Sequence, residues 1–280
     1  MPATEMLLKD LNALFLMVRN AITGKRTKRI LAHPHFPSRG STIYRIAISM
    51  GFEVTNKPSR SFDLAIYWEY ATERTEYELL ESVSAKSEQR VINLYNRNSA
   101  KDQVDDWMQG SFGYSTRVDP EAYSGEAVRK SFTNAVHDGR LIHCPTKPET
   151  GFIYQKFIDS SVNDKEVMDL RVVIMGKEIP HLYLNYREND QRFKNVPYRA
   201  ELCQNIHEQL SEEEVSQLLK FCALAKLEFG ELDVLRDCHD QLIYVVDANN
   251  TPQGPPKHLP AAQKKQAMES YVSSFRRQFM

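Results

Sequence analysis

The segment Glu231 to Pro256 constrains the fold most, because it predicts two paired strands that carry acidic side chains on one face. Its run Leu242 to Val246 is apolar and rich in β-branched residues, and the polar stretch Arg236 to Gln241 predicts a tight reversal before it. Asp233 and Asp247 lie at equal distances from Asp240 in that reversal. An antiparallel pair therefore places the two aspartates opposite each other.

Asn249 adds an amide oxygen to this acidic pair. It follows Asp247 by two residues, and the side-chain period of a strand places both on one face. Carboxylate and amide oxygens are ligands that Mg2+ accepts, usually together with water and nucleotide phosphates. The hairpin therefore predicts Asp233, Asp247 and Asn249 as the metal ligands of a Mg-nucleotide site. The alternative interpretation is a polar hairpin whose acids face solvent.

Composition indicates a globular protein and excludes several classes of function. The 280 residues are 41% hydrophobic and 10% aromatic, enough for the cores of one large or two ordinary domains. The formal net charge is -1 with both signs mixed along the chain, so we expect no nucleic-acid partner. Four cysteines without a CxxC pair predict neither a zinc site nor a disulfide framework, and we expect reduced thiols in a cytoplasmic protein.

The N-terminal residues Thr4 to Ile22 predict an amphipathic helix that ends at Gly24. Its apolar face consists of Met6, Leu7, Leu11, Leu14, Phe15 and Val18. No apolar run approaches the roughly 20 residues that span a bilayer, so no membrane span is expected. The basic run Lys25 to Arg29 could bring the helix to an anionic membrane, but we favour a helix docked on the first domain.

From Arg29 onward, short apolar strands alternate with helices, a rhythm that predicts a mostly parallel sheet. The predicted strands are Ile30 to Ala32, Glu53 to Thr55, Leu64 to Trp68 and Val91 to Leu94, with a helix from about Thr42 to Met50. The loop His33 to Ser41 follows the first strand, where open α/β sheets bind ligands. Its end, Ser38 to Ser41 with Arg39, could hold an anion or simply cap the helix. A metal site at His33 and His35 is disfavoured because no third ligand stands nearby.

The remaining chain predicts antiparallel sheets and three helices. The predicted strands are Ala127 to Ser131 and Gly151 to Ile158, with a polar loop around Asn134 to Gly139, and a hairpin of Met168 to Met175 and Ile179 to Tyr186 that turns at Gly176 and Lys177. A short helix begins at Lys101 and runs to Met108, and Ser211 with Glu214 forms a capping box for a helix that Gly230 ends. The last helix runs from about Ala261 to Phe275.

The motifs and their order along the chain resemble those of the ATP-grasp superfamily, which includes D-alanine–D-alanine ligase, glutathione synthetase and peptide glutamate ligases. LDVLRDCHDQLIYVVDANNTPQG is similar to the metal-binding hairpin of that family, and the resemblance covers about Val91 to Pro256. It implies an α/β and α+β protein, with an ATP-grasp fold and an N-terminal Rossmann-like pre-ATP-grasp domain. The implied division is residues 1–98, a small subdomain over 99–159, and a C-terminal subdomain over 160–280 with the metal hairpin.

The resemblance also implies the residues that bind ATP and Mg2+. GFIYQKFID resembles the strand and hinge whose backbone meets the adenine, which implicates Gln155, Lys156, Phe157 and Ile158. MDLRVVIMGKEI resembles the strand pair that follows, with Asp169 and Arg171 toward the nucleotide. Lys101 and Lys130 match the two lysines that hold the nucleotide, and Arg187 matches a further cation near the phosphates. Arg171 and Arg187 are the implied catalytic residues.

One departure from the family pattern concerns the loop after Lys130. The usual glycine-rich loop is absent, since Ser131 to Leu141 contains Gly139 alone. Asn134, His137 and Asp138 could supply polar contacts to the phosphates, and the alternative is an ordinary surface loop.

The function that the resemblance implies is an ATP-dependent carboxylate–amine ligase. Its partner would be a small-molecule or peptide carboxylate substrate, contacted through the loop His33 to Ser41 and Arg39, and a homo-oligomer is a further expectation. Two alternatives stay open: an ATP-grasp kinase that phosphorylates a small-molecule acceptor, and a non-catalytic nucleotide-binding regulator. The paired acids disfavour the regulator, because crowded carboxylates repel each other unless a cation is held between them.

Overall fold

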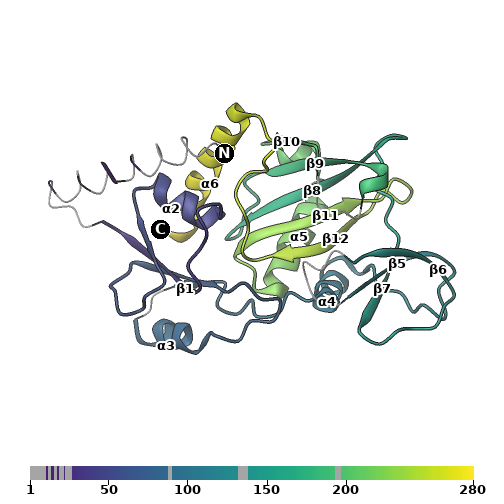
Figure 1. The fold of residues 1–280 in the computed structure, drawn as a ribbon, viewed down its shortest axis with the longest axis horizontal. Helices are drawn as coiled ribbons and strands as arrows, with labels where there is room; N and C mark the ends of the chain where they lie inside the picture. Colours follow the sequence, from purple (N-terminus) through teal and green to yellow (C-terminus); the bar gives the residue numbers. More distant parts are fainter. Residues whose placement is uncertain are drawn as a thin grey trace.

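The computed structural model describes residues 27–87, 90–131, 138–192 and 197–280, together with residues 11, 14, 15, 18 and 22. Over these residues the chain forms a mixed α/β protein with three sheets. Figure 1 shows a small sheet of the N-terminal part, a large sheet in the middle and a second small sheet beyond α4. The strand orders are β2-β1-β3-β4, β10-β9-β8-β11-β12 and β6-β5-β7.

The N-terminal sheet is parallel throughout, as its strand and helix rhythm predicts. It consists of β1 (Arg29–Pro34), β2 (Glu53–Thr55), β3 (Leu64–Trp68) and β4 (Val91–Ile92). Helix α2 (Thr42–Ser49) packs on one face and α3 (Glu78–Ser87), which the sequence reasoning missed, packs on the other. Covering on both faces explains why β3 is one continuous apolar run, buried at every position.

The three-stranded sheet is antiparallel and follows α4 (Lys101–Phe112). Its strands are β5 (Gly125–Ser131), β6 (Arg140–Cys144) and β7 (Phe152–Lys156). Helix α4 runs beyond the predicted end at Met108 and stops at Gly113, whose φ of 83° suits a glycine. Strand β6 was not predicted. The loop residues Asn134 and His137 lie outside the described residues.

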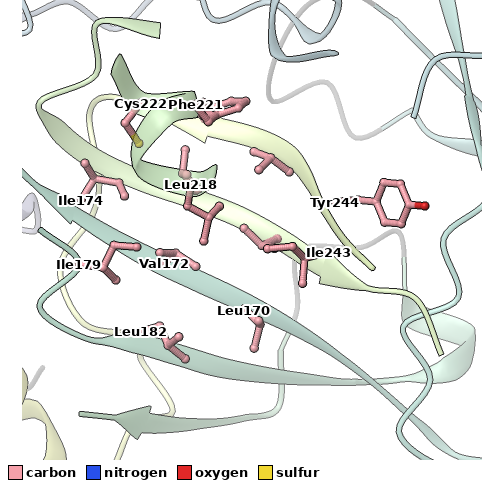
Figure 2. Packing of buried hydrophobic residues seen from close by; sticks show 14 of the residues in the cluster. Leu170, Val172, Ile174, Ile179, Leu182, Leu218, Phe221, Cys222, Ile243 and Tyr244 are labelled. Atoms are coloured by element: carbon pink, nitrogen blue, oxygen red, sulfur yellow. The ribbon is translucent and has the colours of Figure 1, made fainter. Parts of the chain in front are cut away.

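The large sheet is antiparallel, and both predicted hairpins are confirmed within it. Its strands are β8 (Glu166–Met175), β9 (Leu182–Glu188), β10 (Arg199–Cys203), β11 (Phe229–Arg236) and β12 (Ile243–Asn249), with short 3-10 turns η1 (Asn189–Gln191) and η2 (Ile206–Glu208). Helix α5 (Glu212–Ala225) covers one face of the sheet. Figure 2 shows its Leu218, Phe221 and Cys222 against Val172, Ile174 and Ile243 of the strands.

The capping box that opens α5 is confirmed, but its predicted end is wrong. Ser211 and Glu214 exchange both capping hydrogen bonds, whereas the helix ends at Lys226, which takes the left-handed conformation at φ 54°. Gly230 lies inside β11 instead. A side chain there would bring its Cβ to 2.6 Å from the carbonyl oxygen of Asn249, so glycine permits the close approach of β12.

The second face of the large sheet is divided into an apolar half and a polar half. In the apolar half, Val173, Tyr183 and Phe229 pack against Tyr271 and Phe275 of α6 (Ala261–Phe279). The same cluster includes the face of the N-terminal sheet under α2, so the junction between the two sheets is one hydrophobic core. The polar half lies on the same face of the sheet, farther along the strands from α6. It carries most of the residues that the sequence predicts for the site.

The predicted N-terminal helix, Thr4 to Ile22, lies mostly outside the described residues. Its five described apolar residues are exposed, with relative accessibilities from 48% at Val18 to 81% at Ile22, so these side chains are not docked on the first domain as expected. Within the described part of the chain, no helix has the length and apolar character that crossing a membrane requires.

Candidate functional site

A single cavity of about 1200 Å³ is lined by every residue for which the family resemblance implies a catalytic, nucleotide-binding or metal-binding role. It is bordered by the polar half of the large sheet, by β5 and β7, and by the segment Tyr70 to Thr72 that follows β3. The predicted residues that line it are Lys101, Lys130, Gln155, Lys156, Phe157, Ile158, Asp169, Arg171, Arg187, Asp233, Asp247 and Asn249. Their roles stay predictions, but the fold brings them together from six strands, one helix and the hinge after β7.

The acidic pair lies in the register that the hairpin predicts. Asp233 of β11 is directly opposite Asp247 of β12, and a β-bulge follows between Asp233 and Val234. Burial and the neighbouring Asp233 carboxylate raise the pKa of Asp247 to about 6. Two acids are therefore held close enough to repel each other, a cost that a bound cation would remove.

Glu231 is a third acid of this hairpin, and the sequence reasoning missed it. It pairs with Asn249 across the ladder and is only 2% exposed. Burial raises its pKa to about 7, while the hydroxyl of Tyr271 donates a 3.0 Å hydrogen bond to it. The signal was present, because Glu231 and Asp233 are two residues apart and share one face of a strand.

The donor set of this hairpin fits Mg2+. Asp233, Asp247 and Asn249 offer two carboxylates and an amide oxygen, which are hard ligands, and the described residues place no thiol or imidazole beside them in the ladder. The Oδ1 atom of Asn249 accepts a 3.0 Å hydrogen bond from the amide of Thr251, which fixes the direction of this side chain.

Two arginines stand beside the acids on β8 and β9. Nε of Arg171 donates to Oδ1 of Asp233 over 2.9 Å, and Glu231 lies 3.8 Å from the same nitrogen. Arg187 donates to Oδ1 of Asp169. Burial raises the pKa of Asp169, and the charge of Arg187 opposes this shift without cancelling it. Asp169 is 3% exposed, and its buried carboxylate orients the guanidinium group of Arg187 through this hydrogen bond.

Asn185 is a further polar residue of this face that sequence reasoning missed. It is 1% exposed, donates from Nδ2 to Oδ2 of Asp169 over 3.4 Å, and lines the cavity. Its Oδ1 atom has no hydrogen-bond partner among the described residues. Asn185 lies two residues before Arg187 on the same strand, so the side-chain period of a strand predicts that both share one face.

Two lysines face the acids across the cavity. Lys101 is the first residue of α4 and Lys130 lies on β5. Burial and the charge of Lys101 lower the pKa of Lys130 to about 8, while Asp247 opposes that shift. Burial also lowers the pKa of Lys101, again against the attraction of Asp247. Two ammonium groups this close to each other favour a polyanionic ligand between them.

Gln155 of β7, just before the hinge, has a buried side chain that lines the cavity. It is 2% exposed, and Asp105 of α4 accepts its Nε2 hydrogen bond over 2.8 Å. The other oxygen of Asp105 accepts from the amide and hydroxyl of Thr116. An ionised carboxylate only accepts, so Asp105 fixes the orientation of the Gln155 amide.

The side chain of Lys156 points toward the β11–β12 turn. Its Nζ atom lies 2.9 Å from Oδ2 of Asp240 and 2.5 Å from the hydroxyl of Tyr244. These contacts hold the hinge against the hairpin that carries the acids. The prediction that this segment meets adenine therefore concerns its backbone and not this ammonium group.

The loop His33 to Ser41 lies against the segment that follows the acidic hairpin. Thr42 donates from its amide to the carbonyl of Pro252 over 2.9 Å, and Gly254 donates to that of Gly40 over 2.9 Å. The first amide of α2 is thus bonded within the protein, while the anion site at Ser38 to Ser41 stays a prediction beside the helix-cap alternative. Arg45, and not the predicted Arg39, lines the cavity on this side.

The histidines of this loop serve the structure. Nδ1 of His35 accepts a 3.0 Å hydrogen bond from the amide of Tyr70, and the two rings stack. Burial lowers the pKa of His33, which favours a neutral ring.

No protein-family model matches the sequence, and no curated protein matches it. Solved structures do resemble it. The ATP-grasp ligase PsnB complexed with a minimal precursor is 11% identical, with a TM-score of 0.54 over 89% of this chain and 99% of that one. D-alanine–D-alanine ligase from Bacillus anthracis is 12% identical, with a TM-score of 0.51 over 90% of this chain and 97% of that one. The macrocyclase MdnC from Microcystis aeruginosa MRC, bound to precursor peptide MdnA, is 12% identical, with a TM-score of 0.51 over 88% and 100%.

These likenesses show that the chain has the ATP-grasp fold. At identities of 11% to 12% they speak for the fold alone. The resemblance drawn from the sequence motifs is confirmed at this level.

Proposed function

We propose that the protein is an ATP-dependent ligase that activates a carboxylate as an acylphosphate, which an amine then attacks. The observation that carries the proposal is one cavity in which Asp233, Asp247 and Asn249 face Lys101 and Lys130. Ligands for a divalent cation and donors for phosphate thereby line one space. Complexes of ATP-grasp ligases with Mg and ADP, and with ATP, support this choice of cofactors.

The proposed chemistry needs positioning and charge neutralisation by the protein. A carboxylate oxygen of the substrate attacks the γ-phosphorus, and the bond to the bridging oxygen breaks as ADP leaves. The amine nitrogen then attacks the carbonyl carbon, and phosphate leaves as the amine loses a proton. Lys101 and Lys130 would hold phosphate oxygens, and Arg171 and Arg187 would stabilise the charge that develops. Mg2+ on Asp233, Asp247 and Asn249 would neutralise the phosphates.

The substitution Asp247→Ala tests the proposal. We expect ADP release to fall about a thousandfold or more, because one carboxylate can no longer hold the cation. Melting should stay cooperative, since the variant also removes the repulsion between Asp247 and Asp233. Asp164→Ala, an exposed aspartate outside the cavity, is the matched control. Turnover by Asp247→Ala at the wild-type rate would contradict the proposed site.

Product composition separates the ligase from the two alternatives. A ligase releases ADP and phosphate only when both a carboxylate and an amine are present. A kinase with a small-molecule acceptor releases ADP and a phosphorylated product that mass spectrometry detects, without free phosphate. Calorimetry with Mg-ATP identifies a regulator by binding that is not followed by turnover across a broad panel of acceptors.

A further inference from the structure

A second cavity, of about 880 Å³, forms a groove between α2 and α6. These helices pack together, and Figure 1 shows them side by side at the N-terminal side of the large sheet. Arg45 and Pro255 line both this groove and the candidate site. The two cavities therefore meet at this pair of residues, and a chain lying in the groove can continue into the site.

The groove has a strong excess of positive charge. Among the described residues that line it, five are cations, namely Arg45, Lys264, Lys265, Arg276 and Arg277, and Glu269 is the one acid. Within it, Lys265 lies 3.9 Å from Glu269, and Arg277 contacts Glu178 over 2.7 Å. Even with these two pairs the lining stays positive. Apolar side chains, Met268 and Val272 among them, lie between the cations on the same side of α6.

We propose that this groove binds an extended acidic segment of a polypeptide substrate and directs one of its carboxylates past Arg45 into the site. The delivery step rests on the function proposed above, while the binding step does not. The lining residues of α6 run from Ala261 to Arg277, roughly 24 Å at the rise of a helix. An extended chain of about seven residues covers that length.

The junction between the cavities is built so that Arg45 is held in place. A Cβ atom on Gly254 would lie 2.8 Å from Cδ and 2.9 Å from Nε of Arg45, so this side chain packs directly on the backbone of Gly254. Gly254 in turn donates to the carbonyl of Gly40. A carboxylate that leaves the groove meets a guanidinium of fixed position before it reaches the acidic hairpin.

The chemistry of the lining favours an acidic polypeptide over other occupants. None of the described residues that line the groove is aromatic, so among them the stacking platforms that single-stranded nucleic acids need are missing. Met268 and Val272 are half-buried in a concavity, whereas binding to a membrane surface calls for apolar side chains that protrude. The N-terminal segment of the chain itself ends in the basic run Lys25 to Arg29, which the cations of the groove would repel.

Fluorescence anisotropy with a labelled decapeptide of alternating glutamate and leucine tests the binding step on the full chain. We expect saturable binding that the double variant Lys265→Glu/Arg276→Glu weakens at least tenfold. The matched control Lys147→Glu/Lys220→Glu makes the same change in net charge at exposed positions outside both cavities and should bind as the wild type does. A lysine–leucine decapeptide, a single-stranded RNA and vesicles with anionic lipid are the competing ligands.

The outcomes separate this inference from the proposed function. The Asp247→Ala variant should bind the acidic peptide with unchanged affinity, and Gly254→Ala should raise the KM for a peptide acceptor several-fold without changing the KM for ATP. The inference is overturned if the acidic peptide does not bind, if both double variants weaken it equally, or if RNA or vesicles occupy the groove in its place. Peptide binding without ADP release would support the docking groove and contradict the ligase. ADP release with small-molecule carboxylic acids but not with peptides would support the ligase and contradict the docking groove.

Discussion

Gln155 of β7 donates a 2.8 Å hydrogen bond from Nε2 to Oδ2 of Asp105 on α4, which leaves its Oε1 atom as an acceptor. That oxygen is buried and has no partner among the described residues. A buried acceptor of fixed orientation suits a donor on the ligand, and the 6-amino group of adenine is one. The pair Asp105 and Gln155 would thus give the proposed ligase a preference for ATP over a 6-oxo purine nucleotide.

The first prediction concerns this preference. Gln155→Met keeps the volume of the side chain and removes the acceptor, so we expect the KM for ATP to rise about tenfold, the value of one hydrogen bond. The KM for ITP should change little, because its 6-oxo group cannot donate. Steady-state ADP release with both nucleotides measures the ratio. If the ratio of the KM for ATP to the KM for ITP is the same in Gln155→Met as in the wild type, Gln155 does not accept a hydrogen bond from adenine.

The second prediction concerns pH. Lys130 has a pKa of about 8 because of burial and the charge of Lys101, so it loses its charge as pH rises above 8. A bound triphosphate favours the charged form, and ATP binding should therefore take up protons in this range. We expect the KM for ATP to rise between about pH 8 and pH 9.5. Calorimetry at pH 8.5 in two buffers of different ionisation enthalpy measures the proton uptake.

Lys130→Arg is the control for this pH dependence. An arginine stays charged throughout the range, so its proton uptake and the rise in KM should both disappear. In the ligand-free protein the unfolded chain binds more protons than the folded one between pH 8 and 10.5, the ordinary lysine value. The contribution of Lys130 to the free energy of unfolding therefore increases with pH over that window. A KM for ATP that is constant from pH 7 to 9.5 in the wild type would rule out this role.

The acidic hairpin could be predicted from sequence because its signals are local. The reversal and the period of two predict that Asp233 meets Asp247, and the structure has this pair. The β-bulge between Asp233 and Val234, which shifts the register by one residue to bring them opposite each other, was not predicted. The end of α5 was predicted wrongly for a physical reason. Gly230 looks like a helix stop, yet its missing side chain serves the approach of β12, and Lys226 adopts the left-handed conformation in its place.

Contacts between distant segments could not be derived from local patterns. The amide of Thr42 is bonded to Pro252, and no periodicity links positions so far apart. That contact uses the first amide of α2 within the protein, and on this side of the cavity Arg45, not Arg39, is a lining residue. Strand β6 escaped prediction because it is mostly exposed and therefore lacks an apolar pattern.

The third prediction concerns the core under the site. Leu218 of α5 is fully buried against the strands that carry the acids on their other face. Leu218→Ala should lower the free energy of unfolding by about 2–5 kcal/mol, since it leaves a cavity. Leu224→Ala, on the same helix but 43% exposed, should cost less than about 1 kcal/mol. Urea unfolding followed by circular dichroism compares them. Equal losses would mean that α5 does not pack as described.

The fourth prediction concerns Asn93, which joins the N-terminal sheet to the start of β11. It is fully buried at φ 61°, and its Oδ1 atom accepts from the amides of Glu228 and Phe229 over 2.8 and 3.0 Å. Its Nδ2 atom donates to the carbonyl of Phe229 over 2.7 Å. Asn93→Ala removes these three bonds and leaves buried backbone groups unpaired, so we expect a loss of about 2–4 kcal/mol in the free energy of unfolding.

Asn93→Gly separates the side-chain bonds from the backbone conformation. Glycine adopts positive φ without strain, so this variant should be roughly 1 kcal/mol more stable than Asn93→Ala while remaining well below the wild type. Because β11 carries Glu231 and Asp233, both variants should also raise the KM for Mg-ATP at temperatures where they remain folded. Urea unfolding and ADP release measure the two effects. Full stability in Asn93→Gly would show that the bonds to Glu228 and Phe229 contribute nothing, and that only the left-handed backbone matters at this junction.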